Sequence, residues 1–262
     1  MALPIALTIA GSDSGGGAGI QANLKTFTTL GVHGTTAITC LTAQNPKAVT
    51  GIQAAKPSFV LQQIEAVFAE LKPHAVKTGM LFSTDIIRVI SNFWKEGKRP
   101  PLVVDPVMVS TSGAKLLKDS AIRALKNDLL PQAVLVTPNL DEAQILVDQS
   151  FSSIEDLRRA AKSIHSKFGC AALVKGGHLR GGKEAVDIFY DGKTELLLSA
   201  PFVNGVSTHG TGCTYSAAIA AGLAKGMDLP SAVSTAKEFI SNAIAQSVRI
   251  RKHFALNTAV KI

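Results

Sequence analysis

A glycine-rich turn leads directly into a long uncharged segment in the last quarter of the chain. The turn reads Ser207-Thr208-His209-Gly210-Thr211-Gly212-Cys213, and no charged residue follows before Lys225. A segment that is apolar and small on all sides is expected to be a helix buried on most faces. The start of such a helix offers free N–H groups and a positive dipole end, and glycines let an anion approach them closely. We therefore expect an anion site here, the alternative being a tight loop in which glycine serves packing only.

Composition limits the class of protein and of ligand. The 262 residues are 46% hydrophobic and 18% charged, which is enough apolar material for a sizeable core. The net charge is +8, but the 27 Lys and Arg are scattered and aromatic residues make up only 5%. A scattered positive charge without stacking platforms favours small anionic ligands over nucleic acid.

Cysteine usage and hydropathy indicate a cytoplasmic location. Cys40, Cys170 and Cys213 are far apart and form no C-x-x-C pair, so neither a disulfide framework nor a zinc site is indicated. The apolar N-terminus lacks a basic region before it, which argues against a signal peptide. The uncharged stretches 26–46 and 196–224 are interrupted by polar residues and glycine, so we expect no membrane span.

Strand and helix patterns alternate along the chain. Strands are expected at 4–10, 35–42, 75–77, 102–105, 133–136 and 170–174, with a hairpin over 186–198 at the sheet margin. Helical spacing, with capping residues and terminal glycines, separates most of them. No linker or internal repeat is evident, so we expect one α/β domain over residues 1–262 with a largely parallel sheet.

A second glycine-rich loop, Gly11 to Gly19, follows the first strand. Gly17-x-Gly19-x-x-Ala22 fits the loose dinucleotide pattern, but no Asp or Glu occurs between Asp13 and Glu65 to hold a ribose. A nicotinamide-dinucleotide oxidoreductase is therefore disfavoured. We expect this loop to approach a small uncharged ligand through its backbone.

Three charged residues have both a functional and a structural interpretation. Asp105 ends a buried strand, where ligands gather in parallel sheets, but it is also a turn residue before proline. Glu142 lies three positions after Asn139, so it suits a capping box as well as a ligand site. Lys237 lies at the border of an apolar helix stripe and could extend along it to solvent.

Six motifs in order resemble the ribokinase superfamily, and within it the hydroxymethylpyrimidine/phosphomethylpyrimidine kinases of thiamine biosynthesis. The likeness covers about residues 6–246. The motifs that carry it are Thr8-Ile9-Ala10-Gly11-Ser12-Asp13, Gly16-Gly17-Ala18-Gly19-Ile20-Gln21-Ala22, Val104-Asp105-Pro106-Val107-Met108, Thr137-Pro138-Asn139-Leu140-x-Glu142, Lys175-Gly176-Gly177-His178 and His209-Gly210-Thr211-Gly212-Cys213-Thr214.

The resemblance implies a fold and a reaction. The fold is a three-layer α/β/α sandwich with a mostly parallel central sheet, and the expected assembly is a homodimer. The reaction uses ATP and Mg²⁺ to phosphorylate 4-amino-5-hydroxymethyl-2-methylpyrimidine and then its monophosphate. A pyridoxine/pyridoxal kinase is the alternative enzyme, and a ligand sensor without turnover is the alternative class.

The resemblance also implies roles for residues that act on phosphate. Gly210, Thr211, Gly212 and the Cys213 amide would form the anion hole for the moving phosphoryl group. Cys213 stands where most of the superfamily has an Asp base, and we expect its pKa to be lowered at the helix start; a backbone-only role is the alternative. Asp105 and Glu142 resemble magnesium-side carboxylates. Lys175, Thr208 and Lys237 resemble contacts to the nucleotide phosphates.

Gln44 is the residue expected to recognise the substrate. Its amide offers a donor and an acceptor together, which matches the ring nitrogen and amino group of an aminopyrimidine. Gly11, Ala18, Met80 and Val107 would line the same pocket. The chain departs from the family at Asn23, where Asp is usual, and we expect Asn23 to remove a charge near the pyrimidine.

Overall fold

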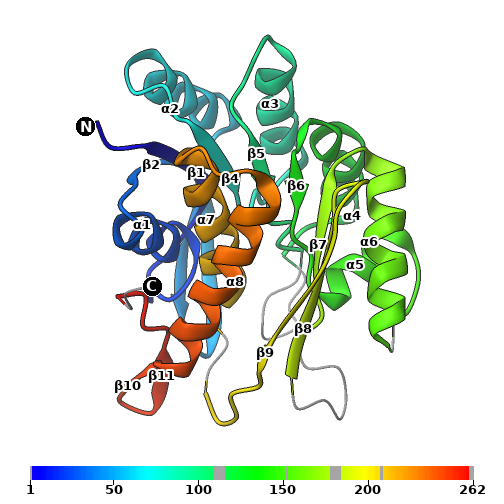
Figure 1. The fold of residues 1–262 in the computed structure, drawn as a ribbon. Helices are drawn as coiled ribbons and strands as arrows, with labels where there is room; N and C mark the ends of the chain where they lie inside the picture. Colours follow the sequence, from blue (N-terminus) through cyan, green and yellow to red (C-terminus); the bar gives the residue numbers. More distant parts are fainter. Residues whose placement is uncertain (1, 109–115, 152, 178–183, 207–208, 260–262) are drawn as a thin grey trace.

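The computed structural model describes residues 2–108, 116–151, 153–177, 184–206 and 209–259. These residues form a sheet flanked by helices (Figure 1). The sheet strands are β1 (Ile5–Asp13), β2 (His33–Asn45), β3 (Ala48–Ala54), β4 (Ala75–Thr78), β5 (Leu102–Val104), β6 (Leu135–Val136), β7 (Ala171–Lys175), β8 (Glu184–Tyr190) and β9 (Glu195–Pro201). The α-helices are α1 (Gly19–Thr29), α2 (Pro57–Glu70), α3 (Thr84–Lys95), α4 (Asp119–Ala124), α5 (Leu140–Val147), α6 (Ile154–Phe168), α7 (Thr211–Ala224) and α8 (Leu229–Ala245).

The sheet is parallel at its centre and antiparallel at its margins. Its nine strands of described residues run in the order β3-β2-β1-β4-β5-β6-β7-β8-β9. The strands from β2 to β7 in that order are all parallel, whereas β3 pairs antiparallel with β2, and β8 and β9 form an antiparallel hairpin beside β7. The predicted parallel sheet with a marginal hairpin is confirmed.

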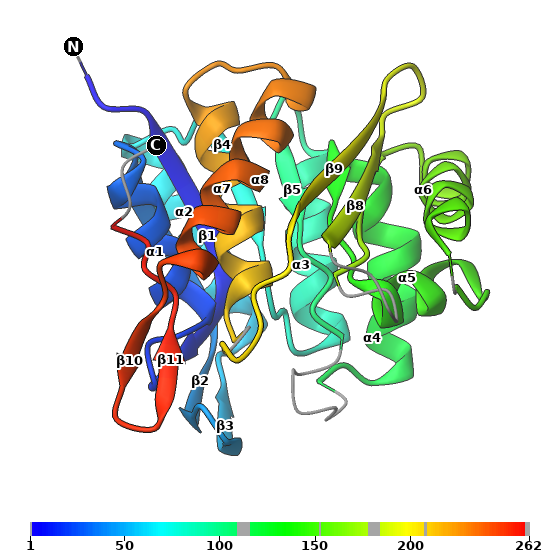
Figure 2. The ribbon, with the colours of Figure 1, turned by 60° about the horizontal axis from the view of Figure 1, so that its bottom comes forward.

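The alternation of side chains along the central strands creates two cores, one on each face. Ala6, Ala75 and Val103 pack in a cluster with α1, α7 and α8. Their chain neighbours Leu7, Val76 and Val104 pack in a cluster with α2 to α6. Figure 1 shows α7 and α8 side by side on one face, and Figure 2 shows this pair between α1 and the β8–β9 hairpin. The three-layer α/β/α architecture is therefore confirmed.

The helix boundaries follow local capping chemistry. Ser83 accepts a hydrogen bond from the Ile86 amide at the start of α3, as its N-cap position predicts. Capping boxes begin both α5 and α6, and Gly169 ends α6 in the left-handed conformation. None of the helices built by the described residues is long and apolar enough to cross a bilayer.

Three structured segments have no counterpart in the sequence prediction. Strand β3 extends the sheet beyond β2, and a small hairpin, β10 (Val248–Ile250) and β11 (His253–Ala255), follows α8. Between β5 and β6, α4 continues into a π-helical turn (Leu125–Leu129) and a 3-10 turn (Leu130–Gln132). The turns over 125–132 lead into the start of β6, whereas β3 pairs with the end of β2 and contributes Val49 to the lining of the candidate site.

Candidate active site

A cavity of about 720 Å³ opens at the carboxyl ends of the central strands. Parallel strands present these ends at one edge of a sheet, where ligands bind in open α/β folds. Its lining contains most of the residues singled out from the sequence. They are Gly11, Ala18, Gln44, Met80, Asp105, Val107, Glu142, Lys175, Gly210, Thr211, Gly212, Cys213 and Lys237. Thr208 lies outside the described residues, and its expected phosphate contact stays a prediction.

The start of α7 forms one wall of the cavity. It packs tightly on the glycine-rich loop from Gly11 to Gly19, which comes first along the chain and is called the first glycine loop below. Gly210 is the N-cap residue and has φ +83°. A Cβ added there would lie 1.9 Å from the carbonyl oxygen of Gly17, so only glycine fits. The first bond within the helix runs from the Thr214 amide to the Gly210 oxygen, so the amides of residues 211–213 precede the helical ladder. They are the groups that an anion in this cavity would meet.

Two lysines hold Asp105 beside this wall. Lys175 Nζ lies 3.3 Å from Asp105 Oδ1, and Lys77 Nζ lies 3.6 Å from Asp105 Oδ2. Burial opposes ionisation of Asp105, but the two ammonium groups outweigh it and lower the pKa of the carboxyl. A Cβ added to Gly212 would lie 3.2 Å from Lys175 Nζ, so this lysine reaches the first turn of α7. Positive charge and free amides thus converge on one point.

Lys77 is a site residue that the sequence analysis did not single out. It is fully buried and lines the cavity. Among the described residues, its only ion pair is with Asp105. A lysine in the middle of a buried strand is a signal in itself, because an unpaired buried ammonium is costly. Its position shows that the cavity contains two cations opposite α7.

Asn23 does not lie in the substrate pocket, so the expected contact with the pyrimidine is wrong. It is fully buried and absent from the cavity lining. Its Oδ1 accepts from Lys77 Nζ at 3.4 Å, and its Nδ2 donates to Thr8 Oγ1 at 2.7 Å. The residue that replaces the usual Asp therefore acts on Lys77, not on a ligand.

Glu142 combines a capping role with a place in the cavity. Its Oε2 accepts from the Asn139 amide at 2.9 Å and its Oε1 from the Met108 amide at 3.2 Å. Burial is the largest cause of its raised pKa, and nearby Asp105 adds to it. The capping box predicted from the sequence is confirmed.

The donor set suits a magnesium ion that arrives with phosphates. Within the described ranges, no group of three or more His, Cys, Asp or Glu could enclose a metal on its own. Asp105 and Glu142 share the cavity, and Mg²⁺ on nucleotides is held by one or two carboxylates together with phosphate oxygens. The residues therefore fit a nucleotide-borne Mg²⁺, which Asp105 and Glu142 would hold directly or through water.

The expected lowering of the Cys213 pKa is wrong. Burial raises the pKa of this thiol above its ordinary value, and Asp105 adds to the effect, while Lys77 and Lys175 oppose it only in part. The free end of a helix favours a thiolate, but desolvation in the cavity wall is the stronger effect. Cys213 is therefore a neutral thiol at neutral pH.

Lys237 is buried, so the alternative interpretation, in which it extends to solvent, is wrong. Its Nζ donates to Asp187 Oδ2 at 2.7 Å and to the Ala185 oxygen at 3.0 Å. The pair lies in the part of the cavity lined by Tyr215 and by apolar side chains of the β9 end and α8. These apolar side chains are Phe202, Val203, Ile240 and Ile244. This region is large, apolar and next to a cation, which suits a flat heterocycle carrying phosphates.

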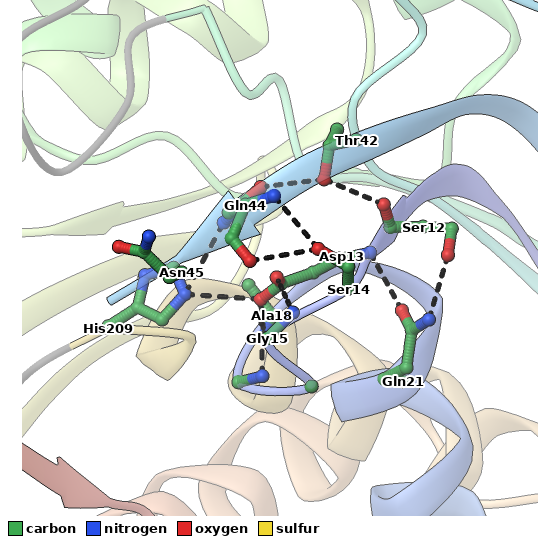
Figure 3. Close-up of polar contacts among 12 residues, drawn as sticks. Ser12, Asp13, Ser14, Gly15, Ala18, Gln21, Thr42, Gln44, Asn45 and His209 are labelled. Atoms are coloured by element: carbon green, nitrogen blue, oxygen red, sulfur yellow. Dashed lines mark hydrogen bonds and ion pairs between the residues drawn. The ribbon is translucent and has the colours of Figure 1, made fainter. Parts of the chain in front are cut away.

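Gln44 lies at the opposite end of the cavity, in a polar cluster with the first glycine loop (Figure 3). Its side chain contacts Thr42 on the same strand and His209 beside the α7 turn. Asp13 organises the loop by accepting from the amides of Gly15, Gly17 and Ala18. The cavity therefore has an amide-bearing end, a cationic centre with free amides, and an apolar end.

Sequence comparison relates this chain to known kinases, which agrees with a cavity suited to a phosphorylated ligand. A family model described as phosphomethylpyrimidine kinase matches residues 13–257. The chain belongs to the phosphomethylpyrimidine kinase family. It is 50% identical to the hydroxymethylpyrimidine/phosphomethylpyrimidine kinase of Rhizobium meliloti over 94% of this chain and 92% of that one. It is 46% identical to the Synechococcus elongatus enzyme of the same name, with 95% of each chain covered.

Two solved structures superpose closely on this chain. The ADP complex of Bacillus subtilis pyridoxal kinase superposes with a TM-score of 0.91 at 37% identity, covering 98% of each chain. Phosphomethylpyrimidine kinase from Clostridium difficile superposes with a TM-score of 0.81 at 41% identity, covering 92% of this chain and 99% of that one. The fold expected from the resemblance is confirmed, and the chain is a phosphotransferase of this family.

Proposed function

We propose that this kinase transfers the γ-phosphoryl group of ATP to the hydroxymethyl group of 4-amino-5-hydroxymethyl-2-methylpyrimidine. It then phosphorylates the resulting monophosphate and gives the diphosphate used to build thiamine phosphate. In the first step the alcohol oxygen bonds to the γ-phosphorus, the bond to the leaving ADP oxygen breaks, and the alcohol proton is released. The names of the relatives support this substrate class.

One observation carries the proposal: the amides of residues 211–213 share a cavity with Gln44 at one end and an apolar region at the other. Phosphoryl transfer has a loose transition state, so the protein mainly positions the groups and neutralises charge. The 211–213 amides, Lys77 and Lys175 surround the place where that charge develops. Gln44 would hold the aminopyrimidine, and Gly11, Ala18, Met80 and Val107 would enclose it.

The nucleotide belongs at the apolar end. We propose that its base lies near Phe202 and Ile240, and that Lys237 and Lys175 contact its phosphates. Thr208, which lies outside the described residues, is a further phosphate contact predicted from the sequence alone. When bound, Mg²⁺ neutralises phosphate charge, with Asp105 and Glu142 as its protein-side oxygens. ADP in the related pyridoxal kinase structure supports nucleotide use by this fold.

The test is incubation of the protein with ATP, Mg²⁺ and the pyrimidine alcohol, followed by mass analysis for mono- and diphosphate. Both products are expected, the monophosphate first. A matched reaction without Mg²⁺ should give neither product. The absence of any phosphorylated pyrimidine with folded protein and ATP would contradict the proposal.

Pyridoxal is the second candidate substrate, because the pyridoxal kinase of B. subtilis superposes on this chain over nearly its whole length. Phosphorylation rates measured side by side for the two alcohols separate the candidates. We expect the pyrimidine to be the better substrate, because the Gln44 amide pairs with an amino group and ring nitrogen that pyridoxal does not offer together.

The remaining expectations concern the protein as a whole. We propose that residues 1–262 act as one kinase domain, that the active form is a homodimer, and that it works in the cytoplasm. Sedimentation analysis of the purified protein tests the dimer directly.

A further inference from the structure

His209 joins three parts of the substrate end of the cavity. Its Nε2 lies 3.3 Å from Asp13 Oδ2 and 3.5 Å from Gln44 Nε2, and Figure 3 shows its ring beside these two side chains and facing both. A Cβ added to Gly17 would lie 2.8 Å from His209 Cδ2, so the ring also packs on the glycine loop. One ring nitrogen thus faces both a carboxylate and the amide that recognises the substrate.

The carboxylate decides what that nitrogen can do. Burial opposes ionisation of Asp13, but the contact with His209 and the hydrogen bonds from the Ala18 and Gly15 amides outweigh burial and lower its pKa. An ionised carboxylate only accepts hydrogen bonds, so His209 Nε2 must carry a hydrogen and donate it. A nitrogen that donates cannot also accept from a Gln44 NH₂ group. The single Nε2 hydrogen can be shared between Asp13 and an amide oxygen, whereas an NH₂ group would face it hydrogen to hydrogen, so the oxygen is the end of the Gln44 amide that suits His209.

The other end of the amide requires the same arrangement. Thr42 Oγ1 lies 2.9 Å from the Ser12 carbonyl oxygen and 3.1 Å from Gln44 Oε1. The hydroxyl has a single hydrogen, and the Ser12 oxygen can only accept it. Thr42 then has a lone pair left for Gln44, which suits an NH₂ group at this end. Because the two ends of a glutamine amide have the same shape, hydrogen bonding decides between them.

We propose that His209, held by Asp13, is a positioning residue that fixes the Gln44 amide with its two ends exchanged, so that Oε1 faces His209 and Nε2 faces Thr42. This inference rests on the proposed function, because it specifies how the pyrimidine is read. The second lone pair of Oε1 and the second hydrogen of Nε2 remain for the ligand. The site thereby selects a ring edge that presents an amino group and an unprotonated nitrogen in a fixed order.

The order matches the expected direction of the substrate. The amino group of the pyrimidine is on the ring carbon next to the one that bears the hydroxymethyl group. With the hydroxymethyl group toward residues 210–213, the amino group lies on the side of the anion hole. His209 directly precedes Gly210, so the acceptor end of the amide lies on that side too. The 4-oxo analogue presents a ring N–H and a carbonyl oxygen instead, which is the reverse pattern.

The experiment compares kcat/KM for the 4-amino substrate and its 4-oxo analogue in wild type, His209→Phe and His209→Gln. Phe keeps a ring against Gly17 but has no donor, whereas Gln restores an N–H toward Asp13 and Gln44. We expect wild type to prefer the amino substrate by about 100-fold or more. The preference should fall about tenfold in His209→Phe and be largely restored in His209→Gln. His33→Phe, at an exposed position, is the matched control and should keep the wild-type preference.

An equal loss on both substrates in His209→Phe would assign His209 a purely structural role and overturn the proposal. Equal use of both substrates by wild type would overturn it as well. If wild type does not phosphorylate the amino substrate at all, that result would instead contradict the proposed function. If His209→Phe does not fold, Thr42→Val tests the other end of the amide, because it removes the acceptor for Nε2 without changing the side-chain shape. The same fall in preference is then expected, and an unchanged preference would contradict the proposal.

Discussion

Cys213 shows how the surroundings of a residue reverse a simple rule. A thiol at the start of a helix is expected to ionise easily, because the amides and the dipole stabilise negative charge. In this cavity the thiol is desolvated and lies near the carboxylate of Asp105, and both raise its pKa. The two lysines that would favour the thiolate are already engaged by that carboxylate. The amide of Cys213 is therefore better suited to catalysis than its sulfur.

We expect Cys213→Ser to keep kcat within about tenfold of wild type, whereas loss of a true general base costs about 100-fold or more. Burial raises the pKa of the Cys213 thiol above its ordinary value, so the sulfur stays protonated as pH rises from about 6 to about 8. The ratio of wild-type to variant kcat should accordingly be flat over that range. A ratio that climbs with pH would show that the thiolate acts as a base.

Single residues differ in how far the sequence can place them. Ile20, Asn23 and Phe27 follow helical spacing, so the burial of Asn23 could have been read from the pattern. Lys237 is different, because its partner Asp187 lies 50 residues away on another element. No local pattern contains that pairing. Residues at strand ends, such as Asp105, were predictable because parallel strands bring their ends together.

Among the elements, α7 contributes most to the site, and its position depends on one glycine. Gly210 holds a left-handed conformation and touches the first glycine loop so closely that no side chain fits. Gly226, just beyond the other end of α7, has a similar φ of +84° but has no atom within 4 Å of an added Cβ. The two glycines share the left-handed backbone conformation, but only Gly210 has neighbouring atoms where a side chain would lie.

Gly226→Ala should lower the free energy of unfolding by about 1 kcal/mol, the cost of the left-handed conformation, and leave kcat unchanged. Gly210→Ala should lower it by about 3 kcal/mol and reduce kcat by about 100-fold, because the helix start must move away from the loop. Urea unfolding and steady-state kinetics measure both effects. Equal behaviour of the two variants would contradict the tight packing of α7 on the loop.

The two capping boxes allow the structural and chemical roles of Glu142 to be separated. Glu142 caps α5 inside the cavity, and Asp156 caps α6 outside its lining. Glu142→Gln and Asp156→Asn should each cost about 1 kcal/mol of stability. Only Glu142→Gln should also raise the Mg²⁺ concentration needed for half-maximal rate, by about tenfold, because it removes a carboxylate from the cavity. A Mg²⁺ dependence unchanged in Glu142→Gln would leave capping as its sole role.

Elements with a repeating apolar pattern were predictable, and irregular ones were not. Helix α3 begins after the capping residue Ser83 and ends shortly before Gly97, in line with the capped helices and terminal glycines that the sequence predicts. Strand β3 lies at the sheet edge and is mostly exposed, so it has no buried face to impose a pattern. The turns from Leu125 to Gln132 change from π to 3-10 geometry, and neither follows the period of an α-helix.

At the scale of the whole molecule, the positive charge favours the phosphorylated ligands. The net charge is +8, and Lys77, Lys175 and Lys237 line the cavity itself. The pyrimidine alcohol is uncharged, whereas its monophosphate and ATP are anions. Surface charge attracts anions over about one Debye length, and salt shortens that length.

Raising NaCl from about 50 to about 300 mM should therefore raise KM for ATP and for the monophosphate several-fold. KM for the uncharged alcohol should change little. Initial rates at the two salt concentrations provide the comparison, with potassium glutamate as a check against specific chloride effects. A parallel rise for all three ligands would indicate general destabilisation by salt.

The close approach of Gly17 to Gly210 joins the first tenth of the chain to its last fifth. During synthesis, the ribosome therefore releases the first glycine loop, one wall of the cavity, long before it makes helix α7, the wall that packs against it. A nascent chain that ends before about residue 225 lacks the complete helix α7 and therefore one wall of the cavity. We expect such a chain not to hydrolyse or transfer phosphate from ATP. Activity should consequently appear in one step, late in synthesis, when α7 closes over the opening loop.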